Sequence, residues 1–205
     1  MPSFAIATMP YSHLQLKPNI TSEEINELPL KAFTGKIEII SREEQLKKTF
    51  EEISHHNAVG FDTETRPVFV RGQHHKVALM QIALTHKVFL VRLKYTGMGP
   101  EIIHFLQNEH ILKVGVALRD DIKALQRLKR FKPAGVFELT ELSKKAGIEA
   151  EGLKKLTALV LQFRISKSAQ TSNWEAEQLN EKQISYAATD AWVCREIYQK
   201  LKGHA

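Results

Sequence analysis

Short apolar segments separated by turns fill the middle of this chain, and their order restricts the folds that it can adopt. Two of them, residues 77–84 and 87–91, are separated only by the polar pair Thr85 and His86, which predicts an antiparallel hairpin. The segments that follow alternate with helical patterns instead. Strands are expected at 36–40, 58–64, 77–84, 87–91, 112–116 and 136–137, with helices at 42–54, 99–109 and 119–129 and a mostly helical remainder. This order predicts an α/β fold whose sheet has mixed strand directions.

Polar residues mark the starts of several of these helices. Thr21 or Ser22 is expected to cap a short helix that ends before Pro29. Ser41, with Glu44 three residues later, has the spacing of a capping box in front of the helix at 42–54. Asn180 and Gln183 have the same spacing at the start of the last helix.

Two carboxylates stand at the end of the strand expected at 58–64. Side chains on a strand alternate between its faces, so Asp62 and Glu64 lie on the same side. Neighbouring carboxylates repel one another, and burial makes that repulsion stronger. A divalent cation such as magnesium offsets it, because hard ions bind carboxylate oxygens. The alternative is a solvated strand end whose two acids face water.

Another pair of acids follows the strand expected at 112–116. Asp120 and Asp121 fall in the first turn of the next helix. Acidic residues there interact favourably with the positive end of the helix dipole, which explains them without any ligand. The other interpretation is that one of the two takes part in a site at the strand end, where α/β sheets commonly bind ligands.

The last helix carries a carboxylate within an apolar stripe. Tyr186 and Asp190 are four residues apart and share a helix face, and Val193 and Ile197 continue it. A carboxylate on a buried face needs a partner. That partner is either a basic side chain or a cation shared with Asp62 and Glu64.

The composition excludes some classes of protein and favours others. No stretch approaches the roughly 20 apolar residues of a membrane span, and the N-terminus lacks the pattern of a secretory signal. Cys194 is the single cysteine, so no internal disulfide forms, which fits the cytoplasm or another reducing intracellular compartment. The net charge of +6 favours a polyanionic partner such as nucleic acid. Residues 1–33 are interpreted as an N-terminal extension and residues 34–205 as the main domain.

Three of these stretches, taken together, match a known pattern. They are FDTET at 61–65, VGVALRDD at 114–121 and YAATD at 186–190. In this order they resemble the DEDD exonuclease superfamily, in the branch with a tyrosine in its third motif, to which the Werner syndrome protein exonuclease domain and ribonuclease D belong. The stretches at 71–82 and 172–174 are also similar, and the likeness covers residues 36–201. Glu138 departs from the pattern, because many relatives have an aspartate there.

The resemblance implies a ribonuclease H-like fold, with a mixed five-stranded sheet flanked by helices, and a metal-dependent 3′–5′ exonuclease. By analogy, Asp62, Glu64 and Asp190 hold one Mg²⁺ or Mn²⁺ ion, and Asp62 bridges to a second ion that Asp121 binds largely through water. Tyr186 orients the attacking water or the scissile phosphate. No nucleotide cofactor is expected.

The expected partners are the 3′ ends of DNA or RNA, with DNA favoured. Arg66, Arg71, Lys76 and Lys167 are candidates for contacts with the substrate, although each could equally be a solvated surface residue. Trp174 is expected to anchor its loop, with stacking on a base as the alternative. Two other functions stay open at this point: trimming of RNA 3′ ends, and a nucleic-acid-binding module without activity. The oligomeric state is not predicted.

Overall fold

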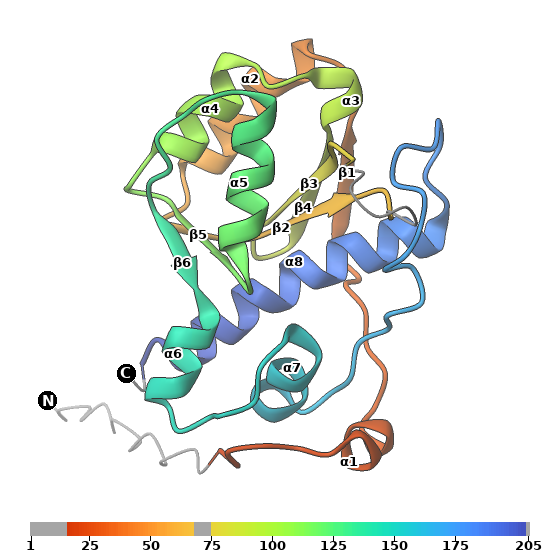
Figure 1. Ribbon diagram of the computed structural model, residues 1–205, viewed down its shortest axis with the longest axis vertical. Helices are drawn as coiled ribbons and strands as arrows, with labels where there is room; N and C mark the ends of the chain where they lie inside the picture. The colour runs from red at the N-terminus through yellow and green to blue at the C-terminus, as the bar shows by residue number, and fades with distance from the viewer. Residues whose placement is uncertain (1–15, 68–74, 204–205) are drawn as a thin grey trace, which may run out of the picture.

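The computed structural model describes residues 16–67 and 75–203, which form a mixed sheet between two layers of helices (Figure 1). The strands are β1 (Lys36–Ile40), β2 (Ala58–Thr65), β3 (Val77–Ala83), β4 (Lys87–Arg92), β5 (Leu112–Gly115) and β6 (Val136–Glu138). Their order across the sheet is β1-β4-β3-β2-β5-β6.

The pairing of the strands confirms the expected mixture of directions. β3 pairs antiparallel with both β2 and β4, so the predicted hairpin is present. The pairs β1–β4, β2–β5 and β5–β6 are parallel. The predicted fold class is therefore confirmed, but the sheet has six strands instead of five, because the three-residue β6 pairs along β5 at the edge.

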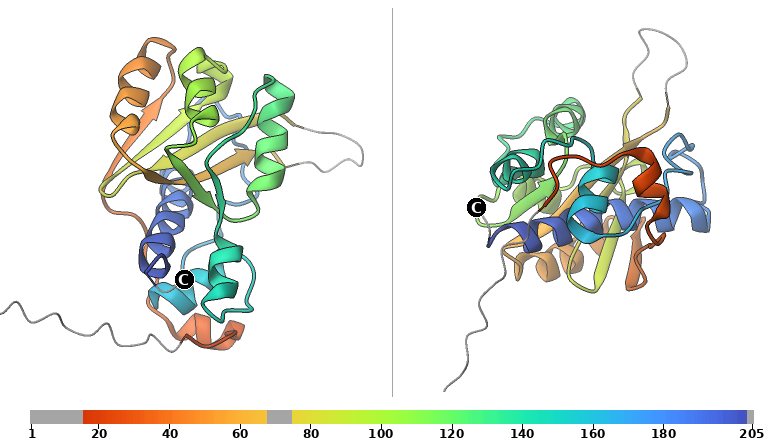
Figure 2. Two further views of the ribbon diagram at one scale, coloured as in Figure 1. Left: turned by 90° about the vertical axis from the view of Figure 1, so that its left-hand side faces the viewer. Right: turned by 90° about the horizontal axis from the view of Figure 1, so that it is seen from below.

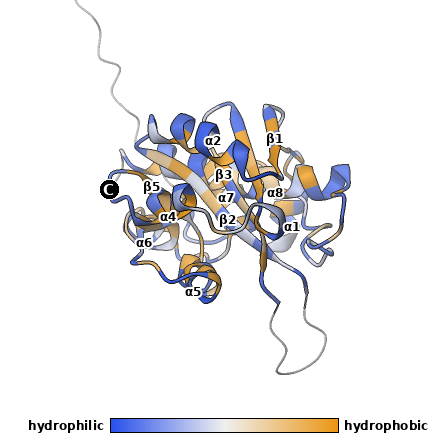
Figure 3. Ribbon diagram, turned by 90° about the horizontal axis from the view of Figure 1, so that it is seen from above, coloured by the Kyte–Doolittle hydropathy of each residue, from blue (hydrophilic) through white to orange (hydrophobic). Residues whose placement is uncertain are grey.

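Helices cover both faces of this sheet (Figures 1 and 2). On one face, α2 (Glu44–Ser54), α4 (Pro100–Gln107) and α5 (Leu118–Leu128) pack against side chains of β2 and β3 such as Phe61 and Ile82. On the other face lies the long helix α8 (Glu181–Leu201), with α6 (Leu139–Lys145) and α7 (Leu153–Leu161) beside it. The short helix α3 (Leu93–Thr96), which the sequence did not predict, follows β4. Figure 3 shows hydrophobic residues concentrated where strands and helices meet.

Two glycines allow the elements around β2 to approach unusually closely. A Cβ at Gly60 would lie 1.8 Å from the backbone oxygen of Ala191, so α8 packs directly on the backbone of β2. A Cβ at Gly115 would lie 2.5 Å from the backbone oxygen of Phe61, so the turn from β5 into α5 also packs against β2. Both α8 and α5 are thereby brought to the end of β2.

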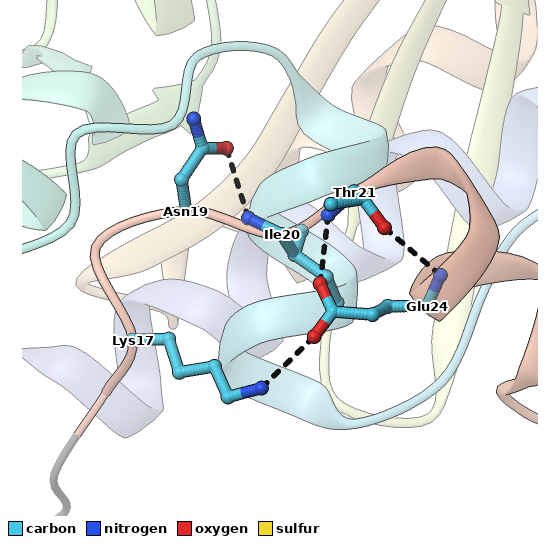
Figure 4. Close-up of polar contacts among 5 residues, drawn as sticks. All are labelled: Lys17, Asn19, Ile20, Thr21 and Glu24. Carbon is cyan, nitrogen blue, oxygen red and sulfur yellow. Dashed lines mark hydrogen bonds and ion pairs between the residues drawn. The ribbon is translucent and has the colours of Figure 1, made fainter.

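The described part of the N-terminal segment packs against the rest of the chain. Of the two predicted caps, Thr21 and Ser22, it is Thr21 that caps α1 (Ser22–Glu27), in a capping box with Glu24 (Figure 4). The backbone oxygen of Pro18 accepts hydrogen bonds from the amides of Glu149 and Ala150. Phe33 is buried. The boundary at residue 33 stays a prediction.

One predicted helix cap is wrong, although the helix that follows it is present. Ser41 does not form a capping box with Glu44; instead the Gln45 side chain accepts hydrogen bonds from the amides of Ser41 and Arg42. The longer Gln45 side chain reaches back over the first turn and satisfies two amides that the helix leaves free. Within the described residues, no helix combines the length and the apolar character needed to cross a bilayer.

Candidate active site

Three carboxylates meet where the end of β2 faces the middle of α8. Asp62 and Glu64 lie on the face of β2 that α8 covers, and Asp190 comes from α8. One oxygen from each carboxylate lies within 4.8 Å of the others. The predicted convergence of these three acids is therefore present in the structure, and we refer to Asp62, Glu64 and Asp190 as the acid cluster.

Burial and mutual repulsion make the charged forms of the two β2 carboxylates unfavourable. Burial raises the pKa of Asp62 well above its usual value, and the charges of Asp190 and Asp121 raise it further. Burial, followed by the charge of Asp62, raises the pKa of Glu64 to about 10. Without a cation, the protein supplies little to balance these charges.

Asp190 has an unsatisfied oxygen in this buried environment. Its side chain is buried, and its Oδ1 has no hydrogen-bond partner among the described residues. Burial raises the pKa of Asp190 to about 7, although the Tyr186 hydroxyl and the Lys167 ammonium group oppose that rise. Burial also raises the pKa of Tyr186, so its hydroxyl keeps its proton at neutral pH.

The fourth predicted acid, Asp121, lies beside the acid cluster and not within it. The hydroxyl of Thr63 donates a hydrogen bond to Oδ1 of Asp121. Thr63 lies on the opposite face of β2 from Asp62, so Asp121 approaches the strand end from the α5 side. Asp120 points away: its side chain is 89% exposed and lies 3.8 Å from Lys123. The geometry therefore places Asp121, and not Asp120, at the site.

The acid cluster opens into a hollow of about 240 Å³ that also carries positive charge. Lys167, a predicted substrate contact, lines this hollow and is exposed. Lys154, on the first turn of α7, lines it as well, and the sequence analysis missed it. The adjacent basic pair Lys154 and Lys155 was the available signal, but nothing in the sequence shows that α7 lies opposite β2.

Two of the other predicted substrate contacts are not among the residues that line this hollow. Arg66 is 3.7 Å from Glu175 in an ion pair. Lys76 lines a separate hollow beside α3 and the end of α5. Arg71 is outside the described residues. Of the predicted substrate contacts that the structure describes, Lys167 lines the hollow of the acid cluster, and the roles of Arg66 and Lys76 stay predictions.

Gln81 is a second residue to which the sequence analysis gave no role. It is the cross-strand partner of Asp62 in the β2–β3 pair, so their side chains share a face of the sheet. Its side chain is fully buried, and neither polar atom of its amide has a partner among the described residues. Its place within the similar stretch at 71–82 was the signal that could have identified it.

Two further residues have structural roles. Trp174 is buried against Tyr186, with ring centroids 6.0 Å apart, so it anchors its loop and is not exposed to stack on a base. Glu138 accepts a hydrogen bond from the amide of Leu118 and caps the start of α6 with its other oxygen. The residue type at 138, at which this chain differs from many relatives, therefore affects the starts of α5 and α6.

The acid cluster has the properties of a site for a hard divalent cation. Its donors are all carboxylate oxygens, the ligands that Mg²⁺ and Mn²⁺ prefer. A buried oxygen of Asp190 lacks a donor. Like charges are held together although no basic side chain forms an ion pair with them among the described residues. A bound cation removes both the unsatisfied oxygen and the repulsion between the carboxylates.

Comparison with known proteins agrees with this geometry. A family model described as 3′–5′ exonuclease matches residues 37–204. The chain belongs to this 3′–5′ exonuclease family. Its members are metal-dependent enzymes.

Individual relatives show how far the likeness extends. DNA polymerase I of Aquifex aeolicus is 32% identical over 80% of this chain and 27% of its own length. The bifunctional 3′–5′ exonuclease/ATP-dependent helicase WRN of Mus musculus is 34% identical over 73% of this chain and 11% of its own. The crystal structure of Escherichia coli RNase D aligns with a TM-score of 0.74 at 22% identity, covering 82% of this chain and 44% of that one. The chain thus spans about a quarter or less of the length of the two relatives matched by sequence.

Proposed function

We propose that this exonuclease removes nucleotides one at a time from the 3′ ends of DNA, using two Mg²⁺ or Mn²⁺ ions. The observation that carries the proposal is the acid cluster: three buried or half-buried carboxylates that meet between the end of β2 and α8, with too few donors to balance them. A phosphodiester brings more negative charge to this site, so the acids cannot act on it without cations.

The roles of the carboxylates follow from their positions. Asp62, Glu64 and Asp190 would hold the first ion, because their oxygens converge. Asp121 lies on the far side of Asp62, which suits a contribution to a second ion largely through water. When bound, such ions stabilise charge on the scissile phosphate and on the attacking and leaving oxygens. Gln81, opposite Asp62, would orient the Asp62 carboxylate.

Tyr186 is suited to donate a hydrogen bond during the reaction. Its raised pKa keeps the hydroxyl protonated, and its ring is held against Trp174. The hydroxyl, one helical turn from Asp190, would orient the attacking water or an oxygen of the scissile phosphate. Lys167 and Lys154, at the edge of the same hollow, would attract the phosphate.

DNA is the favoured substrate, and trimming of RNA 3′ ends is the alternative. DNA polymerase I, a relative at 32% identity, supports DNA. The sequence identity to Escherichia coli RNase D is 22%, so this similarity supports the fold and not the choice of RNA as substrate. A nucleic-acid-binding module without activity is a weaker alternative, since the acid cluster with Asp121 beside it supports a role in catalysis.

The test is a parallel digestion of single-stranded DNA, duplex DNA with a recessed 3′ end, and RNA, each labelled at the 5′ end. With Mg²⁺ or Mn²⁺, the labelled DNA should shorten in single-nucleotide steps. Asp62→Ala should abolish shortening, whereas Asp120→Ala should not, because Asp120 faces solvent. Faster shortening of RNA than of either DNA would overturn the DNA assignment. No shortening of any substrate by the wild-type protein would overturn the function.

A further inference from the structure

Helix α5 leads from the acid cluster to a basic surface that the proposed reaction leaves unused. Asp121 is in its first turn, and the exposed side chains Arg119, Lys123 and Arg127 lie along the helix at intervals of four residues, with Arg130 just beyond its C-terminal end. Residues at this spacing lie along one side of a helix. Arg119, Lys123 and Arg127 thus form a basic stripe on the side of α5 that faces solvent, whereas Asp121 of the same helix faces β2. Figure 1 shows α5 in front of the sheet.

The stripe widens into a hollow at the C-terminal end of α5. This hollow, of about 540 Å³, is lined by Lys123, Gln126, Arg127, Arg130 and Phe131. The Gln126 side chain donates a hydrogen bond to the backbone oxygen of Phe131, which fixes the turn that carries Arg130. We refer to this surface as the α5 hollow.

The cations of the α5 hollow have almost no partners within the protein. Arg127 and Arg130 form no hydrogen bond or ion pair with any residue that the structure describes. Lys123 has a single distant ion pair, 3.8 Å from Asp120. Three cations so close together repel one another, so an anion bound between them would be stabilised.

A second basic hollow on the other side of α5 differs in this respect. Two of the three lysines that line it are already engaged: Lys94 donates to the backbone oxygen of Glu175, and Lys129 to that of Met98. The Glu175 side chain also lines it and brings a negative charge. The α5 hollow is therefore the stronger anion site of the two.

We propose that the α5 hollow binds backbone phosphates of the nucleic-acid substrate a few nucleotides away from the scissile bond. The proposal rests on the proposed function of the acid cluster. Arg127 lies about 9 Å further along the helix axis than Asp121, which corresponds to about three phosphates of one strand in a duplex. Arginine is well suited to this contact, because its guanidinium group can donate two hydrogen bonds to one phosphate.

The position of the α5 hollow favours nucleic acid over other anions. An acidic peptide or an anionic membrane would suit the charge, but neither explains why the stripe is on the helix that carries Asp121. A substrate whose 3′ end lies at Asp62 has its remaining phosphates within reach of α5. The contact is to the backbone, so it should add affinity for long substrates without sequence preference.

The test uses the double variant Arg127→Gln/Arg130→Gln and a matched control, Lys47→Gln/Lys48→Gln. The control removes the same charge from exposed positions on α2. Two readouts separate the α5 hollow from the acid cluster. One is the KM for DNA oligonucleotides of increasing length at several salt concentrations. The other is hydrolysis of the p-nitrophenyl ester of thymidine 5′-monophosphate, which is too small to reach α5.

The expected result is selective for long substrates. The Arg127→Gln/Arg130→Gln variant should raise the KM for long oligonucleotides roughly ten-fold, and the slope of log KM against log salt should fall by about 1.4–1.8 for two lost contacts. Hydrolysis of the small ester, and of oligonucleotides shorter than about three nucleotides, should not change. The control should behave as the wild type.

Two results would overturn the proposal. One is an unchanged KM and salt slope for long DNA in the Arg127→Gln/Arg130→Gln variant. The other is an equal loss in the control, which would show a general effect of net charge. A wild-type protein that hydrolyses neither ester nor DNA would instead overturn the proposed function, while direct binding of long DNA to wild type and variant would still report on the α5 hollow.

Discussion

Lys113 and the acid cluster both bury ionisable groups, and they do so in opposite ways. Lys113 is fully buried, yet its ammonium group donates hydrogen bonds to the backbone oxygens of Phe105 at 3.2 Å and Asn108 at 2.6 Å. These oxygens belong to the end of α4, where a helix leaves its carbonyl groups free and attracts positive charge. The acid cluster is also buried, but Asp190 keeps an oxygen without a donor.

The difference distinguishes a structural charge from one that awaits a ligand. The hydrogen-bond acceptors of Lys113 belong to the same chain, so this site needs no ligand. The carboxylates of the acid cluster repel one another, and the folded chain holds them together although their pKa values rise. Such an arrangement is costly to the free protein and is explained by what binds there.

The largest expected effect is on catalysis. Asp190→Asn should lower the exonuclease rate by at least about 1000-fold, because a metal ligand supports several kcal/mol of transition-state stabilisation and each 1.36 kcal/mol is a factor of ten. The melting temperature of the metal-free variant should not fall, because one of the repelling charges is gone. Asp120→Asn is the control and should keep full rate. A variant that retains activity but melts several degrees lower would make Asp190 a structural residue like Lys113.

Metal should stabilise the acid cluster and leave the Lys113 site unaffected. At a free Mg²⁺ concentration about 100 times its Kd, the free energy of unfolding should rise by about 2.7 kcal/mol. Denaturant titration with Mg²⁺ and with EDTA measures this increment. The increase in the free energy of unfolding that Mg²⁺ causes should disappear in Asp190→Asn and remain in Lys113→Met. An increment that survives in Asp190→Asn would place the ion elsewhere.

Removing the structural charge should reduce stability without reducing activity. Lys113→Met leaves the backbone oxygen of Asn108 without its donor and that of Phe105 with only the Asn108 amide. We expect a loss of about 2 kcal/mol in the free energy of unfolding. The rate per folded molecule should match the wild type. A gain in stability would mean that the burial cost of the ammonium group exceeds the value of its two hydrogen bonds.

The smallest effect concerns pH and the same lysine. Burial lowers the pKa of Lys113 from 10.5 to about 8. Between these values the unfolded chain binds more protons than the folded one, so the Lys113 contribution to stability should rise as the pH increases from about 8 to 10.5. The two carbonyl acceptors favour the charged form, which keeps the expected gain near 1 kcal/mol. The free energy of unfolding of the wild type minus that of Lys113→Met, measured across this pH range, isolates the Lys113 contribution. If this difference falls as the pH rises, the lowered pKa of Lys113 is contradicted.

The sequence predicted those parts of the site that depend on local geometry. Alternation along a strand placed Asp62 and Glu64 on one face, and helical spacing placed Tyr186 one turn from Asp190. Both relations hold within single elements, so a sequence can reveal them. The order of the apolar segments similarly predicted a mixed sheet, because the hairpin and the strand–helix alternation are local patterns.

Relations between distant elements were out of reach. The hydrogen bond from Thr63 to Asp121 depends on how α5 lies against β2, and Lys154 reaches the site only because α7 packs on α8. Lys113 looked like an ordinary strand residue, since its partners come from the end of α4. Even one local prediction was wrong: Gln45, and not Ser41, completes the start of α2.

The absence of a side chain at Gly60 sets how closely α8 packs on β2. A methyl group at Gly60 would collide with the backbone oxygen of Ala191, so α8 would have to move away from β2. Asp190 immediately precedes Ala191, and Asp62 lies two residues beyond Gly60. The distance between these two carboxylates therefore depends on the absence of a Cβ atom at Gly60. Selection for catalysis would therefore act on a position that never touches metal, water or nucleotide.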